Sequence, residues 1–233
     1  MADPLVTVVI PARNEAAFIG AALGSVAVQH LDGGRVEAVV VVNGTSDGTA
    51  AVARAAAARM RATPVRVIEV PEPGVARAKN IGARAARGPL LVFLDADSRM
   101  APDLLARIIG RAMNGAPAGC IRLVADSGDA IDRGFFALIE VGKRAFAIRA
   151  NMLYCRRDLF LEAGGFDERL QHAEDRDLLV RLQRRGLVVT HVSDSWIATS
   201  PRRLHEGPAR VGVARVLGRW ALGHAGFWRE RPY

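Results

Sequence analysis

The sequence predicts an α/β fold in which a Rossmann-like, mostly parallel sheet is flanked by helices and followed by a C-terminal helical extension. Two observations carry this prediction. Apolar runs typical of strands alternate with stretches of helical spacing through the first half of the chain, and this order produces parallel strands joined by right-handed crossovers. Most of these strands are continuous aliphatic runs, as expected where helices cover both faces of a sheet. The 233 residues suffice for one large core, so we expect a single domain over residues 1–233.

Strict alternation defines the elements of the first half. We expect strands at residues 6–10, 36–42, 65–70 and 90–94, and helices at residues 18–26, 49–60, 74–87 and 102–113. A Pro-Glu-Pro-Gly run at 71–74 and a Gly-Pro pair at 88–89 separate the neighbouring elements, as breakers of both helix and strand do.

The second half is less regular. We expect strands at residues 120–124, 152–155 and 188–192, an acidic turn and a helix within 168–185, and helical segments at 131–146 and from 210 onward. The last of these segments places Val211, Val216, Leu217, Trp220 and Leu222 among arginines, the pattern of a basic amphipathic helix.

The net charge of +8 is concentrated near the C-terminus, where the last 33 residues carry seven Arg against two Glu. Such a tail indicates an anionic partner: a phosphate ligand, a membrane surface or a nucleic acid. The basic residues lack interleaved aromatic side chains, so we expect no nucleic-acid binding. The two cysteines have no zinc or disulfide spacing, and the N-terminus lacks the pattern of a signal peptide. We therefore expect a cytoplasmic protein, with residues 207–233 as a peripheral contact to the inner face of the membrane or packed on the domain.

Two aspartates directly follow the apolar strand at 90–94. Asp95 and Asp97 alternate along the chain, so on an extended backbone both point the same way. Paired carboxylate oxygens suit a hard cation, Mn²⁺ or Mg²⁺, and such a cation suits a diphosphate. The alternative is a strand-end turn with two solvated acids.

Other polar loops follow the first two strands. Arg13 and Glu15 are candidates for holding a phosphate and a ribose hydroxyl, although Asn14 and Glu15 also suit the start of a helix. Asn43 offers an amide donor and acceptor to a base edge. The alternative is an Asn-Gly turn in which Asp47 caps the next helix.

Two further polar clusters are candidates for the same site. Lys79 belongs to a basic group, with Arg77, Asn80 and Arg84, that forms either a phosphate site or an ordinary exposed helix face. Glu174 and Asp175 open a helix. Acidic side chains at the start of a helix interact favourably with the helix dipole. A carboxylate beside a diphosphate could also serve as a general base.

From residue 5 to about 190 the chain resembles the family 2 glycosyltransferases, nucleotide-sugar enzymes of the A-type glycosyltransferase fold. The resemblance rests on six motifs in the order of the family: VTVVIPARNE, NGTSDGT, ARAKNIG, LDAD, GGFDE and EDRDL. It implies a nucleotide-sugar-binding half at about 1–98 and an acceptor half at about 99–233. Many relatives carry two acids where this chain has Val42 and Asn43, which weakens the expectation of a uracil base.

The resemblance also assigns roles. Pro11, Arg13 and Glu15 would lie along the nucleoside, Asn43 would face the base, Asp47 would also bind the nucleotide, and Lys79 would meet a phosphate. Asp95 would touch ribose or metal, and Asp97 would bind Mn²⁺ or Mg²⁺. Asp175 would be the catalytic general base, with Glu174 as its neighbour or its substitute in that role. His191 and His205 are candidate further metal ligands, and Arg202 and Arg203 are candidates for the diphosphate.

The implied activity is metal-dependent transfer of a sugar, with inversion, from a nucleoside-diphosphate sugar to an acceptor hydroxyl. A lipid-linked molecule is one candidate for that acceptor. A retaining transferase, a sugar nucleotidyltransferase and a non-catalytic anion-binding module are the alternatives. A nucleotidyltransferase usually carries a Gly-rich basic loop after the first strand, whereas this chain has Pro-Ala-Arg-Asn-Glu.

Overall fold

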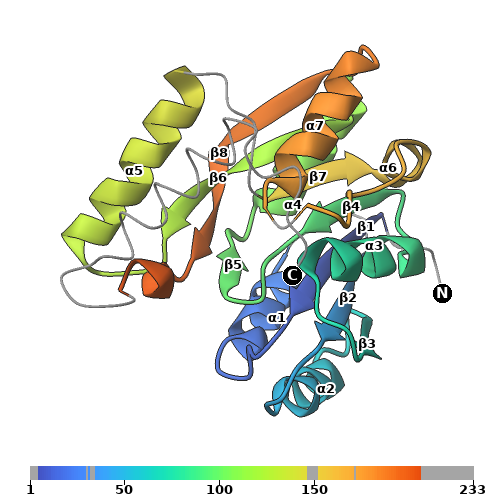
Figure 1. The fold of residues 1–233 in the computed structure, drawn as a ribbon, viewed down its shortest axis with the longest axis vertical. Helices are drawn as coiled ribbons and strands as arrows, with labels where there is room; N and C mark the ends of the chain where they lie inside the picture. Colours follow the sequence, from blue (N-terminus) through green and yellow to red (C-terminus); the bar gives the residue numbers. More distant parts are fainter. Residues whose placement is uncertain (1–4, 30, 32–34, 146–151, 171, 206–233) are drawn as a thin grey trace.

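The computed structural model describes residues 5–29, 31, 35–145, 152–170 and 172–205. An eight-stranded sheet runs through them in the order β3-β2-β1-β4-β7-β6-β8-β5 (Figure 1). The strands are β1 (Val6–Ala12), β2 (Val36–Asn43), β3 (Val65–Val70), β4 (Leu90–Phe93), β5 (Ser98–Met100), β6 (Ala118–Ala125), β7 (Leu153–Arg156) and β8 (Val189–Thr199). The helices are α1 (Ile19–Ala27), α2 (Thr49–Arg59), α3 (Val75–Ala85), α4 (Leu104–Met113), α5 (Ala130–Ala145), α6 (Arg157–Glu162), α7 (Glu174–Arg184) and the 3₁₀ turn η1 (Pro201–Leu204).

The pairing confirms the predicted sheet in its first half. β1 pairs in parallel with both β2 and β4, and β2 pairs in parallel with β3. Every residue of β1 and β2 is buried, as their continuous aliphatic sequences predict. In the second half β7 runs antiparallel to both β4 and β6, while β6 and β8 are parallel.

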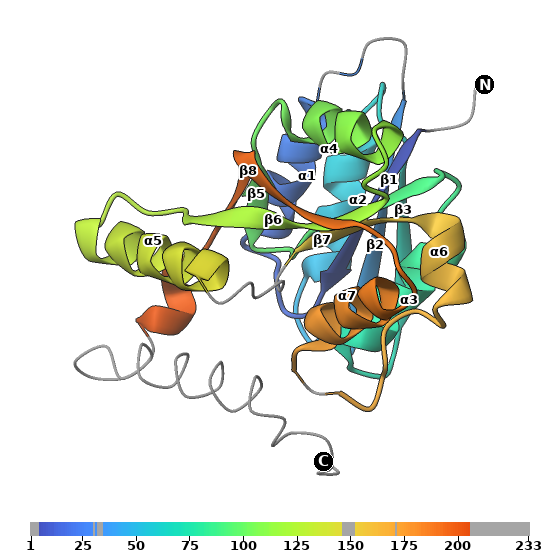
Figure 2. The same ribbon diagram turned by 90° about the horizontal axis from the view of Figure 1, so that it is seen from above.

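Helices cover both faces of the sheet, as Figure 2 shows. Leu23 of α1, Ala53 of α2 and Leu105 of α4 join the core on one face. Ala83 of α3, Phe160 of α6 and Leu179 of α7 join the core on the other. Because β1 pairs in parallel with β2 and β4, the carboxyl ends of these three strands lie at one edge of the sheet, where the loops of a functional site gather.

Three elements differ from the sequence prediction. β5 was not expected, because three residues that pair antiparallel with the end of β8 leave no periodic signal of their own. β8 extends to Thr199 instead of ending at 192. The sequence prediction stopped too early because polar residues at 193–195 interrupt the apolar run. α6 was also not expected, whereas the helix expected within 168–185 begins at Glu174, as predicted, after a left-handed Ala173.

The C-terminal segment from 210, expected to be an amphipathic helix, lies outside the described residues. Within the part of the chain that is described, no helix combines the length and the apolar character needed to cross a bilayer.

Gly119 of β6 gives a sharp test of the second half of the sheet. A Cβ at this position would lie 2.6 Å from both the Thr190 carbonyl oxygen and the Tyr154 ring. Because the neighbouring backbone cannot move aside, we expect Gly119→Ala to lower the free energy of unfolding by roughly 1–3 kcal/mol in urea denaturation. Gly110→Ala in α4 is the matched control, since nothing lies within 4 Å and the change should add about 0.5–1 kcal/mol. Equal effects of the two substitutions would contradict the packing of β6 between β7 and β8.

Candidate active site

The most buried charged group of the site is Lys79, on the inner face of α3. Its Nζ donates to Glu174 Oε1 and Asp175 Oδ1, each at 2.8 Å. The three side chains are 4%, 10% and 14% exposed, and the ammonium also lies 5.1 Å from the centre of the Phe166 ring. The sequence suggested that Lys79 reaches a phosphate, but the structure directs its ammonium to the acid pair at the start of α7.

Burial and charge shift the pKa values of this cluster in different directions. Burial raises the pKa of Asp175 to about 6, because the opposing pull of Lys79 is partly cancelled by the charge of Glu174. The pKa of Glu174 is lowered, since its ion pair with Lys79 outweighs the effect of burial. Lys79 stays protonated: burial lowers its pKa, but Asp175 and Glu174 together raise it more. Asp175 is therefore the carboxylate of the pair that takes up a proton first.

Asp95 and Asp97 lie in the tight turn between β4 and β5, where Ser98 N donates to Asp95 O at 3.0 Å. The expectation that they alternate on an extended strand is wrong, because β4 ends at Phe93. The two carboxylates are nonetheless close enough to interact. Burial raises the pKa of Asp95, and the charge of Asp97 raises it further against the opposing charges of Lys79 and Arg203. Asp95 thus connects the Lys79 cluster electrostatically to Asp97.

Arg202 of η1 bridges two loops of the site. Its guanidinium pairs with Glu15 and lies 3.1 Å from Asp97 Oδ2, and it stacks 4.6 Å from the centre of the Phe18 ring. Glu15 also has an orphaned oxygen, Oε2, which is buried without a hydrogen-bond partner among the described residues. η1 therefore brings a cation from the C-terminal part of the chain to acids that follow β1 and β4.

The loops after β1 and β2 are held together by hydrogen bonds. Asp47 accepts from the backbone N–H groups of Thr49 (3.0 Å) and Ala16 (3.2 Å), so it caps α2 and braces the first loop. The Thr49 hydroxyl donates to Asp47 and lowers the pKa of this carboxyl, and the backbone N–H groups lower it further against the opposing effect of burial. The hydroxyl of Thr49 also accepts from Glu15 N at 2.8 Å. The alternative capping role for Asp47 is thus present in the structure.

Asn43 is buried at the end of β2. In the amide orientation that satisfies both groups, its nitrogen donates to Ala12 O at 3.1 Å and its oxygen accepts from Gly74 N at 3.0 Å. The amide that was expected to face a base is therefore occupied by backbone partners. Pro11, expected in a loop, belongs instead to β1, where it is paired in register with Val41 and buried.

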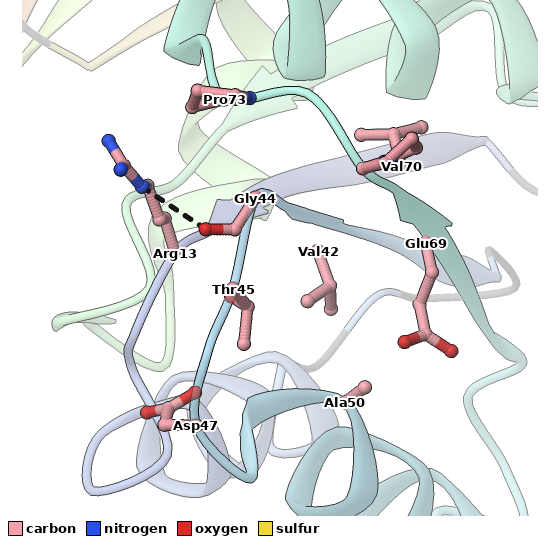
Figure 3. A pocket seen from close by; sticks show the side chains of 10 residues that line it. Arg13, Val42, Gly44, Thr45, Asp47, Ala50, Glu69, Val70 and Pro73 are labelled. Atoms are coloured by element: carbon pink, nitrogen blue, oxygen red, sulfur yellow. Dashed lines mark hydrogen bonds between the residues drawn. The ribbon is translucent and has the colours of Figure 1, made fainter.

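A pocket of about 650 Å³ opens beside these loops. Figure 3 shows Arg13 at its rim, hydrogen bonded to Gly44 O at 3.4 Å, with Thr45 and Asp47 on one side and Glu69 on the other. The lining is completed by Val42, Ala50, Val70, Pro71 and Pro73. A planar ligand entering here would contact aliphatic side chains and the backbone of the β2–α2 loop.

The two histidines proposed as metal ligands lie with other acids. His191 Nε2 is 3.3 Å from Glu140 Oε2, and His205 Nε2 is 2.9 Å from Asp132 Oδ1, both acids being on α5. No cluster of three or more potential metal-binding His, Cys, Asp or Glu side chains occurs in the described part of the chain. The structure thus brings neither histidine into a ligand cluster with Asp97.

Asn80 has a bracing role that sequence reasoning missed. Its amide accepts from Phe166 N and donates to Phe166 O and Glu168 Oε1, each at 2.9 Å. It therefore fixes the loop that leads to the acid pair of α7. The spacing Ala76, Lys79, Asn80 and Ala83 places both polar residues on the alanine face of α3 and could have indicated that they point inward.

Comparison with known proteins identifies the family of this chain. The family model Glycosyl transferase family 2 matches residues 7–160. The chain is 36% identical over 117 residues to a validoxylamine A glucosyltransferase of Streptomyces hygroscopicus subsp. jinggangensis, covering 49% of this chain and 27% of that protein. This chain thus spans about a quarter of the length of that relative.

Two solved structures share the fold. S. aureus TarS 1–349 in complex with UDP-GlcNAc has a TM-score of 0.68 at 18% identity, covering 93% of this chain and 66% of that one. The mannosyltransferase PcManGT from Pyrobaculum calidifontis, in complex with GDP-Man and Mn²⁺, has a TM-score of 0.68 at 25% identity, covering 85% of this chain and 57% of that one. With the family model matching more than half of its residues, the chain belongs to glycosyl transferase family 2 and has the A-type glycosyltransferase fold.

Proposed function

We propose that this glycosyltransferase moves a sugar, with inversion, from a nucleoside-diphosphate sugar to an acceptor hydroxyl, with a divalent cation at Asp97 and Asp175 as general base. The observation that carries the proposal is the arrangement around Lys79: a buried carboxylate with a pKa raised to about 6 lies next to the ammonium, and the charge of Asp95 contributes to that raised pKa. A base that is ionised at neutral pH yet can hold a proton is what such a transfer requires.

The acids after β4 fit a divalent cation. Asp95 and Asp97 supply hard oxygen donors, and Asp97 accepts a cationic group at 3.1 Å in the form of the Arg202 guanidinium. Asp97, assisted by Asp95, would hold the ion, while most of its remaining ligands would come from the diphosphate and water. When bound, Mn²⁺ or Mg²⁺ supplies charge neutralisation for the leaving diphosphate.

The remaining polar groups have roles that follow from their positions. The Arg202 guanidinium already pairs with the carboxylates of Glu15 and Asp97. A diphosphate bound at this position would offer it negatively charged oxygens in place of those carboxylates. Arg203 is exposed and close enough to lower the pKa of Asp95. The pocket beside Arg13 is proposed for the nucleoside, and the solved neighbours with UDP-GlcNAc and GDP-Man leave the base open.

At the acceptor, Asp175 would take the proton of the attacking hydroxyl as the bond to the anomeric carbon forms from the face opposite the diphosphate. Lys79 holds one oxygen of this carboxylate at 2.8 Å, which leaves the other for the substrate. A lipid-linked acceptor, and a membrane contact through residues 207–233, remain predictions, because that segment lies outside the described residues.

A thermal-shift panel of nucleoside diphosphates and nucleotide sugars, each with Mn²⁺ and with chelator, tests the donor and metal parts of the proposal. At one hundred times its Kd a ligand adds about 2.7 kcal/mol of stability. For a chain of this size we therefore expect the melting temperature to rise by roughly 5–10 °C with the correct nucleotide and metal. No shift with any nucleotide, with or without metal, would contradict the donor site.

Asp97→Ala tests the assignment of the metal. Removing this carboxylate should abolish the Mn²⁺-dependent part of the nucleotide shift, because the remaining acid, Asp95, has a pKa raised by burial and is a poorer ligand alone. Asp126→Ala is the matched control, since it removes only an exposed pair with Arg99. If Asp97→Ala and the control keep the same metal-dependent shift, the ion is held elsewhere.

A further inference from the structure

α5 buries several charged side chains beside Phe136, which packs against the core, and exposes large apolar ones. Three charged side chains are almost fully buried: Asp132 at 1%, Glu140 at 5% and Lys143 at 2% exposure. Three large apolar side chains face outward instead: Ile131 at 62%, Leu138 at 67% and Val141 at 62% exposure. An amphipathic helix normally buries its apolar stripe, so this orientation indicates a partner on the outer side.

Polar contacts fix this orientation. Glu140 Oε1 accepts from Lys143 Nζ at 2.6 Å and from Leu123 N of β6 at 3.3 Å. At the other end Asp132 accepts from the Ser127 hydroxyl at 2.8 Å and is 2.9 Å from His205 Nε2. Rotating α5 to bury its apolar residues would expose this network and break the buried ion pair of Glu140 and Lys143, which is strongly destabilising. The apolar face therefore stays outward.

The outer residues form one stripe. Residues 131, 138 and 141 are separated by seven and three positions, which places them within about a quarter of a helical turn around the axis. Gly134 and Gly142 lie on the same side, so another helix could approach the backbone closely. α5 itself lies at the margin of the molecule, away from the helices that cover the rest of the sheet (Figures 1 and 2).

We propose that the chain's own C-terminal segment, residues 206–233, covers this stripe. The described chain ends at His205, which contacts Asp132 in the first turn of α5, and η1 lies beside that end of the helix (Figure 1). The segment has 28 residues, and α5 has 16 residues with a length of about 24 Å. It therefore starts in the right place and is long enough to run along α5.

The sequence of the segment matches the stripe. Val213, Val216, Leu217 and Trp220 recur at the spacing of one helical face, while Arg215 and Arg219 fall on the other side of the same helix. Packing of the two stripes buries both and leaves the arginines in water. Because the segment is tethered next to α5, its effective concentration there is in the millimolar range, far above that of a second copy or another protein.

Thiol labelling of the full-length chain tests the proposal. The native Cys120 and Cys155 are buried, so a single introduced cysteine should dominate the reaction with a water-soluble maleimide. We compare Leu138→Cys with Met113→Cys on α4, where the native side chain is 81% exposed. A covered stripe predicts labelling at 138 at least about tenfold slower than at 113, because only the undocked fraction reacts.

A second substitution tests whether residues 206–233 are the segment that protects position 138. Adding Trp220→Asp to Leu138→Cys should restore fast labelling, and adding it to Met113→Cys should change nothing. Equal rates at 138 and 113 in the parent variants would overturn the proposal. It would also be overturned by protection at 138 that grows with protein concentration, which indicates a second copy. Protection that appears only with anionic lipid vesicles would overturn it too, because the membrane would then be the partner.

Discussion

Asp175→Asn should reduce turnover by about 10²–10⁴-fold, the usual contribution of a general base, while nucleotide binding in the thermal-shift panel stays within a few-fold of the parent. The amide keeps an oxygen for Lys79, which lies 2.8 Å from Asp175 Oδ1, so the loop before α7 should keep its shape. A variant that retains full turnover would remove Asp175 from the reaction.

The pH dependence of the parent enzyme provides a second measurement at the same residue. Burial raises the pKa of Asp175 to about 6, so kcat/KM should fall as the pH is lowered through about 6 and the base becomes protonated. Glu174→Gln removes a like charge that raises this pKa, and its acid limb should therefore move to lower pH. An acid limb that stays in place in Glu174→Gln would mean that another group sets it.

Stability should respond in the opposite sense to activity. The pKa of an ordinary Asp is 3.8, so the folded state binds the Asp175 proton more tightly than the unfolded chain, and the free energy of unfolding falls as the pH rises from about 4 to about 6. Asp175→Asn removes that cost. We expect the variant to gain roughly 1–3 kcal/mol relative to the parent at pH 8 and little at pH 4.

Much of the fold follows from local sequence patterns. The aliphatic runs of β1, β2 and β4 predict buried parallel strands, and the breakers at 71–74 and 88–89 delimit α3 correctly to within a few residues. β5 could not be predicted in this way, because its three residues become a strand only through pairing with Ile197 to Thr199 of β8. The end of β8 was missed for a related reason: its polar residues at 193–195 carry no strand signal.

The sequence analysis identified most residues of the candidate site but not the contacts between them. Lys79, Glu174 and Asp175 were each singled out, yet their ion pairs join positions 95 and 96 residues apart, and no local pattern encodes such a pairing. Arg202 was considered for a diphosphate, but its pairing with Glu15 and Asp97 depends on how η1 folds back to β1 and β4. Asn43 shows the same limit, because the backbone groups that occupy its amide belong to Ala12 and Gly74, each about 31 residues away in the sequence.

Lys79→Met should have the largest effect on stability. The substitution keeps the aliphatic stem but leaves Glu174 and Asp175 buried without their cation, and removing one partner of such a pair typically costs about 3–5 kcal/mol. We expect a loss of that size at pH 8 in urea denaturation. The loss should be smaller near pH 5, because protonation of the acids removes the repulsion that Lys79 otherwise offsets. Adding Glu174→Gln should recover part of the stability at pH 8, because one of the two uncompensated charges is gone.

Lys79→Met also distinguishes two effects: the loss of the Lys79 charge, which changes the pKa of Asp175, and the general loss of stability. The charge of Lys79 lowers the pKa of Asp175, so without it the acid limb of kcat/KM should move above 6. Lys143→Met is the matched control: Lys143 is equally buried, pairs with Glu140 at 2.6 Å, and lies on α5 away from the acid pair. It should destabilise the chain in the same way and leave the acid limb unchanged. A limb that moves equally in both variants would show that loss of stability, and not the charge of Lys79, governs the pH dependence.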